Sequence, residues 1–171
     1  MNIQLKQAGS EQLDTIMDVY IRCKKDLDEK GLLQWNDQYP SRDYFKEEMN
    51  DGNLYVLMVN DKVAGSVTLN DWQSPEWSEI PWKLANEWVI HALFLDPLQQ
   101  GNGLGKVFIE KCEELAREKG FESIRLDAYS RNTGANSLYE KMGYEYRGSV
   151  YFTSKPVGHQ EYRCYEKALT L

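Results

Sequence analysis

The stretch Asp96-Pro97-Leu98-Gln99-Gln100-Gly101-Asn102-Gly103-Leu104-Gly105-Lys106 decides how this chain is interpreted. An apolar run from Trp88 to Leu95 precedes it and is typical of a buried strand. Apolar residues at helical spacing from Val107 to Lys119 follow it. A strand, a glycine-rich turn and a helix start together direct free backbone N–H groups and the positive end of a helix dipole toward one spot. The stretch therefore predicts an anion-binding loop.

The glycine spacing in this loop disfavours two common phosphate motifs. A P-loop has four residues between its first glycine and a Gly-Lys-Ser/Thr ending. Here only three residues separate Gly101 from Gly105, and Val107 stands where the hydroxyl belongs. A dinucleotide fingerprint has the spacing G-x-G-x-x-G/A, and Gly105 comes one residue too early for it. The remaining readings are a loop for another kind of diphosphate and a glycine-rich turn without a ligand.

The composition narrows the class of protein further. A chain of 171 residues is long enough to bury a full core, and no Gly/Ser/Pro-rich linker divides it. We therefore predict one domain over residues 1–171. The net charge of −7 argues against nucleic acid as a partner, because phosphate binding needs a basic patch. The apolar runs are too short to span a bilayer, so no membrane association is expected.

The cysteines and histidines indicate in which redox compartment the protein works and whether it binds a metal. The three cysteines, Cys23, Cys112 and Cys164, are odd in number and far apart, which indicates reduced thiols in a cytoplasmic protein. The start of the chain lacks the basic-then-apolar pattern of a signal peptide. The two histidines, His91 and His159, lack the spacing of metal ligands, so we expect no metal site.

Hydrophobic periodicity predicts the element order β-α-α-β-β-β-α-β-α-β-β. The expected strands cover 3–6, 54–59, 63–69, 88–95, 123–128, 144–148 and 161–169, and the expected helices cover 11–28, 41–51, 107–119 and 133–142. This order indicates an α/β fold with a mixed sheet, whose parallel core is the β-α-β unit from 88 to 128. The irregular stretch 71–86 contains three tryptophans and is either a lid loop or an aromatic patch packed on the sheet.

Two motifs together resemble a known family. The run from Gln100 to Gly105 matches Q/R-x-x-G-x-G/A, and the segment from Asn132 to Tyr144 matches N-x-x-A-x-x-x-Y-x-x-x-G-F/Y at every marked position. In this order and at this spacing they resemble the GNAT family of acyl-CoA-dependent N-acyltransferases. The resemblance covers about residues 3 to 169 and is weakest over the first two helices and the stretch 71–86.

The resemblance implies a fold and a cofactor site. The fold would be a mixed central sheet of six to seven strands flanked by about four helices. Coenzyme A would lie between two parallel strands that splay apart, 88–95 and 123–128. The cofactor would be acetyl-CoA, whose acetyl group passes directly to an amine in a ternary complex. The implied cofactor-binding residues are Leu93, Phe94, Leu95, Gln100, Gly101, Asn102, Gly103, Leu104, Gly105, Lys106, Asn132, Asn136 and Tyr139.

The resemblance also implies catalytic residues. Tyr139 matches the position of the family's general-acid tyrosine, although a helix tyrosine packed on a sheet is the alternative. Some members carry a catalytic carboxylate near the level of Val89, and valine cannot serve as a base. By strand alternation Glu87 and His91 share a face with Val89 and Leu93, so either could act as the base through a water. Each has an ordinary structural role as its alternative.

The sequence says least about the amine that would accept the acetyl group. Aromatic rings attract ammonium groups, so candidates for an acceptor pocket are Trp35, Tyr39, Trp72, Trp77 and Trp82; packing is their alternative role. A small-molecule or peptide amine is expected, and a homodimer is compatible with the family. The rival function is a GNAT-like domain that binds acyl-CoA without catalysis, as a sensor or an assembly module.

Overall fold

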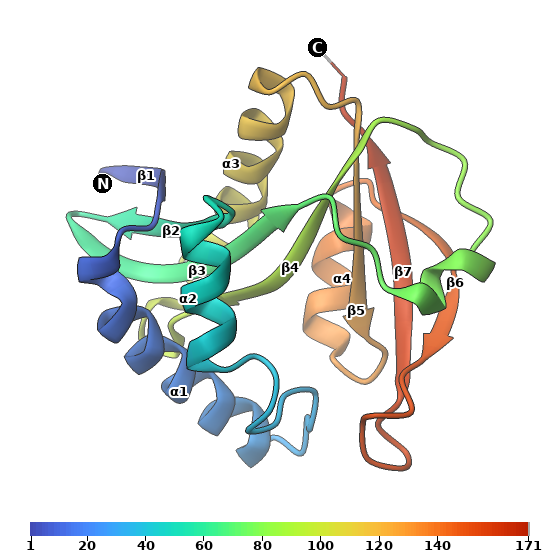
Figure 1. Cartoon of the computed structure of the whole chain (residues 1–171), viewed down its shortest axis with the longest axis horizontal. Coiled ribbons are helices and arrows are strands. Elements are labelled where there is room, and N and C mark those ends of the chain that lie inside the picture. The colour runs from blue at the N-terminus through green and yellow to red at the C-terminus, as the bar shows by residue number, and fades with distance from the viewer. Residues whose placement is uncertain (171) are drawn as a thin grey trace. The chain divides into compact units, whose positions relative to one another are not determined.

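The computed structural model describes residues 1–170, and its helices and strands follow the predicted order (Figure 1). The strands are β1 (Ile3–Gln7), β2 (Leu54–Val59), β3 (Lys62–Asn70), β4 (Glu87–Leu95), β5 (Ser123–Tyr129), β6 (Glu145–Tyr151) and β7 (Glu161–Ala168). The α-helices are α1 (Leu13–Glu29), α2 (Arg42–Asn50), α3 (Leu104–Glu118) and α4 (Thr133–Lys141). Three short 3-10 helices complete the list: η1 (Ser10–Gln12), η2 (Pro75–Glu79) and η3 (Pro97–Gln99).

The strands form a seven-stranded mixed sheet in the order β1-β2-β3-β4-β5-β7-β6. The parallel pair is β4 with β5, in which Glu87 lies opposite Ser123 and Val89 lies opposite Arg125. The ladders β1–β2, β2–β3, β5–β7 and β6–β7 are antiparallel. The predicted α/β class, the mixed sheet, the four helices and the parallel pair are confirmed.

Local sequence signals explain most of the element ends. Asn60 and Asp61 take left-handed φ values of 49° and 68°, as the tight turn between β2 and β3 requires. The Ser41 hydroxyl accepts a hydrogen bond from the Tyr44 N–H at 3.2 Å and so caps the start of α2. Gly120, at φ 87°, lies just past the end of α3, where only glycine adopts the left-handed conformation without strain.

The chain forms two compact units, each built from two segments. The first unit contains residues 1–69 and 91–112, and the second contains residues 70–90 and 113–171. A single domain over residues 1–171 stays a prediction. In the first unit α1 and α2 lie beside β2 (Figure 1). Ile16, Phe45 and Leu54 are completely buried in the core that these elements share.

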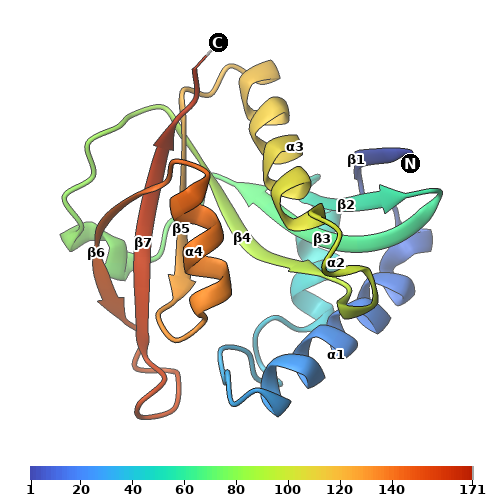
Figure 2. The same ribbon diagram turned by 180° about the vertical axis from the view of Figure 1, so that it is seen from behind.

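The second unit has a helix on one face of its strands. Helix α4 lies beside β5 and β7 (Figure 2), and the Tyr165 hydroxyl of β7 donates to the side-chain carbonyl of Asn136 in α4 at 2.8 Å. Tyr165 lies opposite Leu126 in the β5–β7 register, so both belong to the face that α4 covers. Strand alternation turns the neighbouring residues, such as Asp127, toward the other face.

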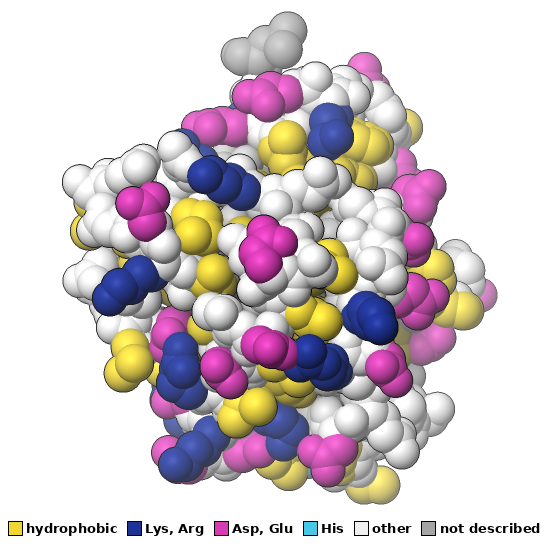
Figure 3. Space-filling view, turned by 60° about the vertical axis from the view of Figure 1, so that its left-hand side comes forward, with side chains coloured by type: hydrophobic (Ala, Val, Ile, Leu, Met, Phe, Trp, Pro, Cys, Tyr) yellow, Lys and Arg dark blue, Asp and Glu magenta, His cyan; other side chains and the backbone are white. Residues whose placement is uncertain are grey.

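The surface carries both signs of charge close together. In the view of Figure 3, acidic and basic side chains alternate among apolar ones. On α1, Lys24 pairs with Asp28 at 2.7 Å and Lys30 pairs with Asp26 at 2.8 Å. None of the helices within residues 1–170 has the length and apolar character needed to cross a membrane. All three cysteines are buried, and none of them is in a disulfide.

Gly65 of β3 tests how tightly the first unit is packed. A Cβ built there would lie 2.4 Å from the Phe94 carbonyl oxygen and 2.9 Å from the Phe108 ring. Gly65→Ala should therefore lower the free energy of unfolding by about 2 kcal/mol, measured by urea denaturation. The matched control is Gly134→Ala in α4, where a built Cβ would lie 3.8 Å from its nearest neighbour, Asn132 Oδ1; it should raise stability by about 0.5 kcal/mol. Equal stability of the Gly65→Ala variant and the wild type would contradict this packing.

Candidate active site

The turn between β4 and α3 is held in place by Asp96. Its backbone N–H donates to the Ala64 carbonyl at 2.7 Å, and its carboxylate accepts from the Leu98 N–H at 3.1 Å. Arg22 of α1 donates to both carboxylate oxygens, at 2.7 and 3.3 Å. Burial raises the pKa of Asp96, but the Arg22 guanidinium and the Leu98 N–H outweigh it and hold the pKa below its usual value. Asp96 therefore stays ionised and fixes the start of the turn.

The glycines of this turn adopt the conformation that an anion-binding loop needs. Gly101 and Gly103 have φ values of 90° and 72°, and a Cβ at either position would meet no atom within 4 Å. The loop is thus open on the side of these glycines. Helix α3 begins at Leu104, and the first N–H groups of a helix have no partner within it. The predicted set from Gln100 to Lys106 lies on this one segment and fits a diphosphate.

The end of β4 leads into this turn through an irregular backbone. Ala92 has a φ of 46° inside the strand, which a non-glycine residue adopts only at a cost. Such a residue interrupts the regular alternation of side chains, so whether Leu93 shares a face with His91 stays a prediction. Leu95 is fixed beyond it, because its carbonyl accepts from Cys23 Sγ and Gln100 Nε2, both at 3.1 Å.

The side chains of this segment divide between core and surface. Phe94 is buried and its ring lies 5.8 Å from that of Tyr20 and 5.9 Å from that of Trp35, so a cofactor contact of Phe94 would run through its backbone. Trp35, predicted for the acceptor pocket, belongs to this ring cluster. Tyr39 is partly exposed and packs edge-on against Tyr44 at 5.0 Å. The acceptor roles of Trp35 and Tyr39 stay predictions.

Helix α4 of the second unit carries the second predicted motif. Asn132 caps it, because its side-chain oxygen accepts from the Ala135 N–H at 3.1 Å. Asn136 is buried, and its amide donates to the carbonyls of Tyr129 and Asn132 at 2.9 and 2.8 Å. These bonds engage both donors of the Asn136 amide in the fold. Tyr139 is buried to 8% exposure, and its ring lies 5.7 Å from that of Tyr144.

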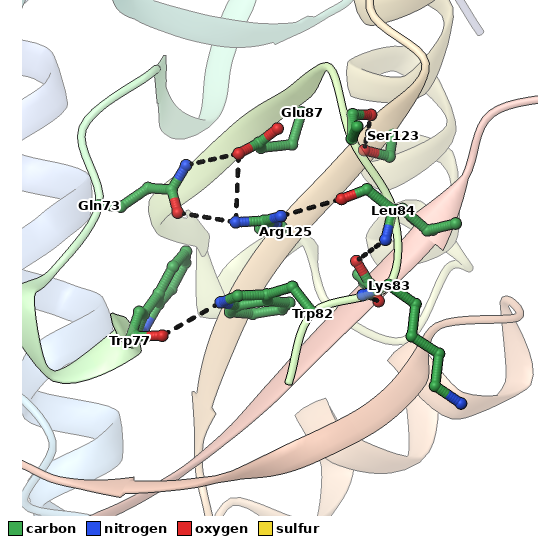
Figure 4. A network of polar contacts seen from close by, with 10 residues as sticks. Gln73, Trp77, Trp82, Lys83, Leu84, Glu87, Ser123 and Arg125 are labelled. Carbon is green, nitrogen blue, oxygen red and sulfur yellow. Dashed lines mark hydrogen bonds and ion pairs between the residues drawn. The ribbon is translucent and has the colours of Figure 1, made fainter. Parts of the chain in front are cut away.

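Glu87 is part of a network that anchors the stretch 71–86 (Figure 4). Its Oε1 pairs with Arg125 Nη1 at 3.1 Å and accepts from Gln73 Nε2 at 2.9 Å. Arg125 also donates to the Gln73 side chain and to the Leu84 carbonyl, each at 2.9 Å. Arg125 lies 38 residues after Glu87 and belongs to neither sequence motif, so the sequence did not indicate this pair. Glu87 therefore has a structural role, and its role as a base stays a prediction.

A second set of hydrogen bonds, made by Glu166, holds the stretch 71–86. The fully buried carboxylate of Glu166 accepts from the backbone N–H groups of Lys83 and Leu84 at 2.8 and 3.1 Å. Trp82 donates to the Trp77 carbonyl at 3.2 Å, and the Arg125 guanidinium lies 4.5 Å from its ring centroid. These contacts favour a packed surface over a lid. Trp72 differs, since 59% of it is exposed.

Neither sequence motif points to Asp127. Only the alternation of Arg125, Asp127 and Tyr129 with apolar residues indicates that β5 has a polar face. Trp77 Nε1 donates to its Oδ2 at 3.0 Å. Burial raises the pKa of Asp127 to about 6, while the Trp77 bond and the charge of Lys155 act in the opposite direction. Within residues 1–170 no group of three or more His, Cys, Asp or Glu is placed to hold a metal ion.

The model of the acetyltransferase (GNAT) family matches residues 13–144. The chain belongs to the GNAT family of acetyltransferases. The predicted resemblance is thereby confirmed, and acetyl-CoA is the typical cofactor of this family.

Curated relatives and solved structures agree with this assignment. An uncharacterized N-acetyltransferase of Methanocaldococcus jannaschii is 27% identical over 144 residues, which is 82% of this chain and 60% of that protein. A GNAT-family acetyltransferase structure from Streptococcus agalactiae 2603 has a TM-score of 0.84 at 20% identity, covering 99% of this chain and 96% of the other. The PaiA N-acetyltransferase of Thermoplasma acidophilum, solved with coenzyme A, has a TM-score of 0.72 at 18% identity, covering 98% and 99%. At these identities the solved structures show a shared fold.

The raised pKa of Asp127 makes stability depend on pH. The value rises from the ordinary 3.8 to about 6, so the folded protein holds this proton more tightly than the unfolded chain. The resulting stabilisation is complete below about pH 4 and is lost as the pH rises through about 6. A shift of two units corresponds to about 3 kcal/mol.

Asp127→Asn should remove this dependence, because an amide carries no charge and still accepts the Trp77 hydrogen bond. We expect the variant to melt about 5 °C above the wild type at pH 7.5, and the difference to be smallest at pH 4.5. Calorimetric melting at both pH values measures this. A difference that does not change between pH 4.5 and 7.5 would show that the Asp127 carboxylate costs no stability.

Proposed function

We propose that this chain transfers the acetyl group of acetyl-CoA to the amine of a small molecule. The observation that supports it most is the open turn at Gly101 and Gly103, which leads directly into the start of α3 and is fixed by Asp96. In this proposal the backbone N–H groups from Gly101 to Lys106 hold the pyrophosphate of coenzyme A. The backbone from Leu93 to Leu95 pairs with its pantetheine arm.

The chemistry of the transfer assigns tasks to particular groups. Acetyl-CoA supplies an activated thioester, from which the C–S bond is broken as a C–N bond to the amine forms. The amine must lose a proton, and the departing sulfur must gain one or be hydrogen-bonded. We assign the donor role toward sulfur to the Tyr139 hydroxyl, and we keep His91 and Glu87 as candidates for taking the amine proton. The ion pair of Glu87 with Arg125 makes His91 the better candidate of these two.

Loop variants test the pyrophosphate contacts. Gly103→Ala forces an alanine into a left-handed backbone or reshapes the loop, so coenzyme A affinity should fall about 10-fold in calorimetric titration. Gly31→Ala is the matched control, because Gly31 also has a positive φ, 76°, and also has no atom within 4 Å of a built Cβ. Gly31→Ala introduces the same backbone strain at a position outside the loop, so it should leave coenzyme A affinity unchanged. Equal losses in both variants would overturn the loop assignment.

Tyr139→Phe tests catalysis separately from binding. Removing a general acid should lower turnover by about 10²-fold in a thiol-release assay over a panel of amines. The melting shift induced by coenzyme A should remain, since the ring stays in place. Tyr151→Phe, at a residue that is 61% exposed, serves as the control and should match the wild type.

A loss of less than about threefold in Tyr139→Phe would refute the general-acid role. The rival function, an acyl-CoA-binding module without catalysis, predicts a different result for the wild type. It predicts thermal protection by coenzyme A without thiol release for any amine in the panel.

A further inference from the structure

The segment between β6 and β7, residues 152–160, carries a histidine that belongs to neither sequence motif. Figure 1 shows this segment at the lower end of β7. The Phe152 N–H donates to the Gln160 carbonyl at 2.9 Å, and the His159 N–H donates to a carbonyl of the same segment, also at 2.9 Å. The Phe152 ring packs edge-on against that of Tyr162 in β7, with the centroids 5.0 Å apart. His159 is therefore held in an ordered segment.

The imidazole of His159 uses one of its two nitrogens. Nδ1 is hydrogen-bonded to the hydroxyl of Tyr129, the last residue of β5, which is only 2% exposed. Nε2 has no hydrogen-bond partner within residues 1–170, and His159 is half-buried. Burial raises the pKa of Tyr129, against the opposing charge of Arg131, so Tyr129 stays a neutral phenol. A phenol oxygen accepts a hydrogen bond from a protonated Nδ1, and in that tautomer Nε2 has a free lone pair.

His159 and Tyr139 lie on opposite sides of β5. The ring of Tyr139 lies 6.2 Å from that of Tyr165, which belongs to the face that α4 covers. Strand alternation turns Tyr129, and with it the imidazole, toward the other face. His159 is also at the carboxyl end of β5, and ligands of α/β sheets bind beyond the carboxyl ends of parallel strands. The imidazole is therefore placed where a substrate can approach from the side away from α4.

Several charged groups surround this imidazole. The Arg131 guanidinium lies beside the segment, since its Nη2 is 3.6 Å from a Cβ built at Gly158. The charged and titratable groups on the elements around His159 are Asp127, Tyr129, Arg131, Lys155, Glu161 and Tyr162. Burial lowers the pKa of Lys155 and raises that of Asp127 to about 6. Because an imidazole ordinarily titrates in the same range as this carboxyl group, an experiment has to separate the two.

We propose that His159 takes the proton of the acceptor amine at Nε2, and that Tyr129 positions the imidazole through Nδ1. The inference rests on the proposed function, in which Tyr139 donates toward sulfur. Nitrogen and sulfur are separate substituents of one carbon in the tetrahedral intermediate, so the proton acceptor and the proton donor approach from different sides. His159 and Tyr139 meet this requirement. Glu87, in contrast, is engaged by Arg125.

The proton transfers balance in this scheme. The acceptor arrives as an ammonium ion and gives one proton to Nε2 of His159, which leaves a lone pair on nitrogen. This pair forms the C–N bond as the C–S pair leaves on sulfur, and sulfur takes the hydroxyl proton of Tyr139. The second nitrogen proton returns to the Tyr139 oxygen through solvent, and the imidazolium releases its proton to solvent. One proton is released for each acetyl group transferred.

The pH profile of kcat/KM tests this role. The assay measures thiol release from acetyl-CoA with putrescine, spermidine and 2-phenylethylamine, and the profile uses the amine that the wild type turns over fastest. With a base of its own the wild type uses the ammonium form, so its kcat/KM should change less than about twofold from pH 8 to pH 9. Without that base only the neutral amine reacts, and its fraction rises about 10-fold over this interval. The kcat/KM of His159→Asn should rise in parallel, and at pH 7 it should be about 10²-fold below that of the wild type.

Further variants separate proton transfer from positioning. Asparagine has a polar atom at the place of Nδ1, so His159→Asn keeps a hydrogen bond to Tyr129 and should melt within about 3 °C of the wild type. Tyr129→Phe loses this bond and keeps the imidazole, so kcat should fall about fivefold while the profile stays level. A merely structural role would give both variants the same profile.

Two more variants serve as checks. His159→Gln also lacks a titrating nitrogen and should repeat the profile of His159→Asn. Val157→Ala changes a residue of the same segment that is 92% exposed, and it should match the wild type. In all variants the acetyl-CoA KM should stay within about twofold of the wild-type value, because none of these residues is assigned to the cofactor.

The outcomes distinguish the inference from the proposed function. A level profile in His159→Asn and His159→Gln, in a protein whose wild type transfers acetyl groups, would overturn the role of His159 and leave the proposed function standing. Loss of the level profile in Asp127→Asn or His91→Asn instead would assign the proton to another residue and would also overturn it. A wild type that releases no thiol with any of the three amines would refute the proposed function, and the role of His159 with it.

Discussion

The ion pair of Arg22 with Asp96 fixes the start of the glycine-rich loop from Gln100 to Lys106. Asp96 joins three parts of the first unit: α1 through Arg22, β3 through the Ala64 carbonyl, and η3 through the Leu98 N–H. With its start fixed in this way, the chain can leave Gly101 and Gly103 in left-handed conformations that face open space. The N–H groups at the start of α3 then remain available to an anion, which is the physical basis of a diphosphate site.

On the face of the second unit away from α4, the charged groups Arg125 and Glu166 are engaged by partners. Arg125 is engaged by Glu87 and by loop groups, and Glu166 holds the backbone N–H groups of Lys83 and Leu84. These contacts hold the stretch 71–86 in one conformation. Asp127 stands out on this face, because burial raises its pKa to about 6 and makes its ionised form costly. Groups that cost stability in this way are concentrated at functional sites, where a ligand compensates for them.

The sequence allowed the element order, the mixed sheet and the glycine loop to be predicted, because periodicity and motif spacing are local signals. It did not reveal contacts between distant segments. It also did not reveal the left-handed φ of Ala92, which interrupts the alternation between His91 and Leu93. Glu87 could not be matched with Arg125, nor Asp127 with Trp77, because these pairs form only after distant segments meet. Asn136 was predicted from its motif, yet its amide donors are used by backbone carbonyls.

The most direct measurement concerns the backbone N–H groups of residues 101 to 106. Amide resonances in an NMR titration report each of these groups separately, and pantetheine offers a ligand that shares the arm of coenzyme A but lacks its pyrophosphate. The expected result is that coenzyme A shifts the resonances of Gly101 to Lys106 strongly and pantetheine leaves them unmoved. Equal shifts with both ligands, or none with coenzyme A, would contradict a pyrophosphate held by this loop.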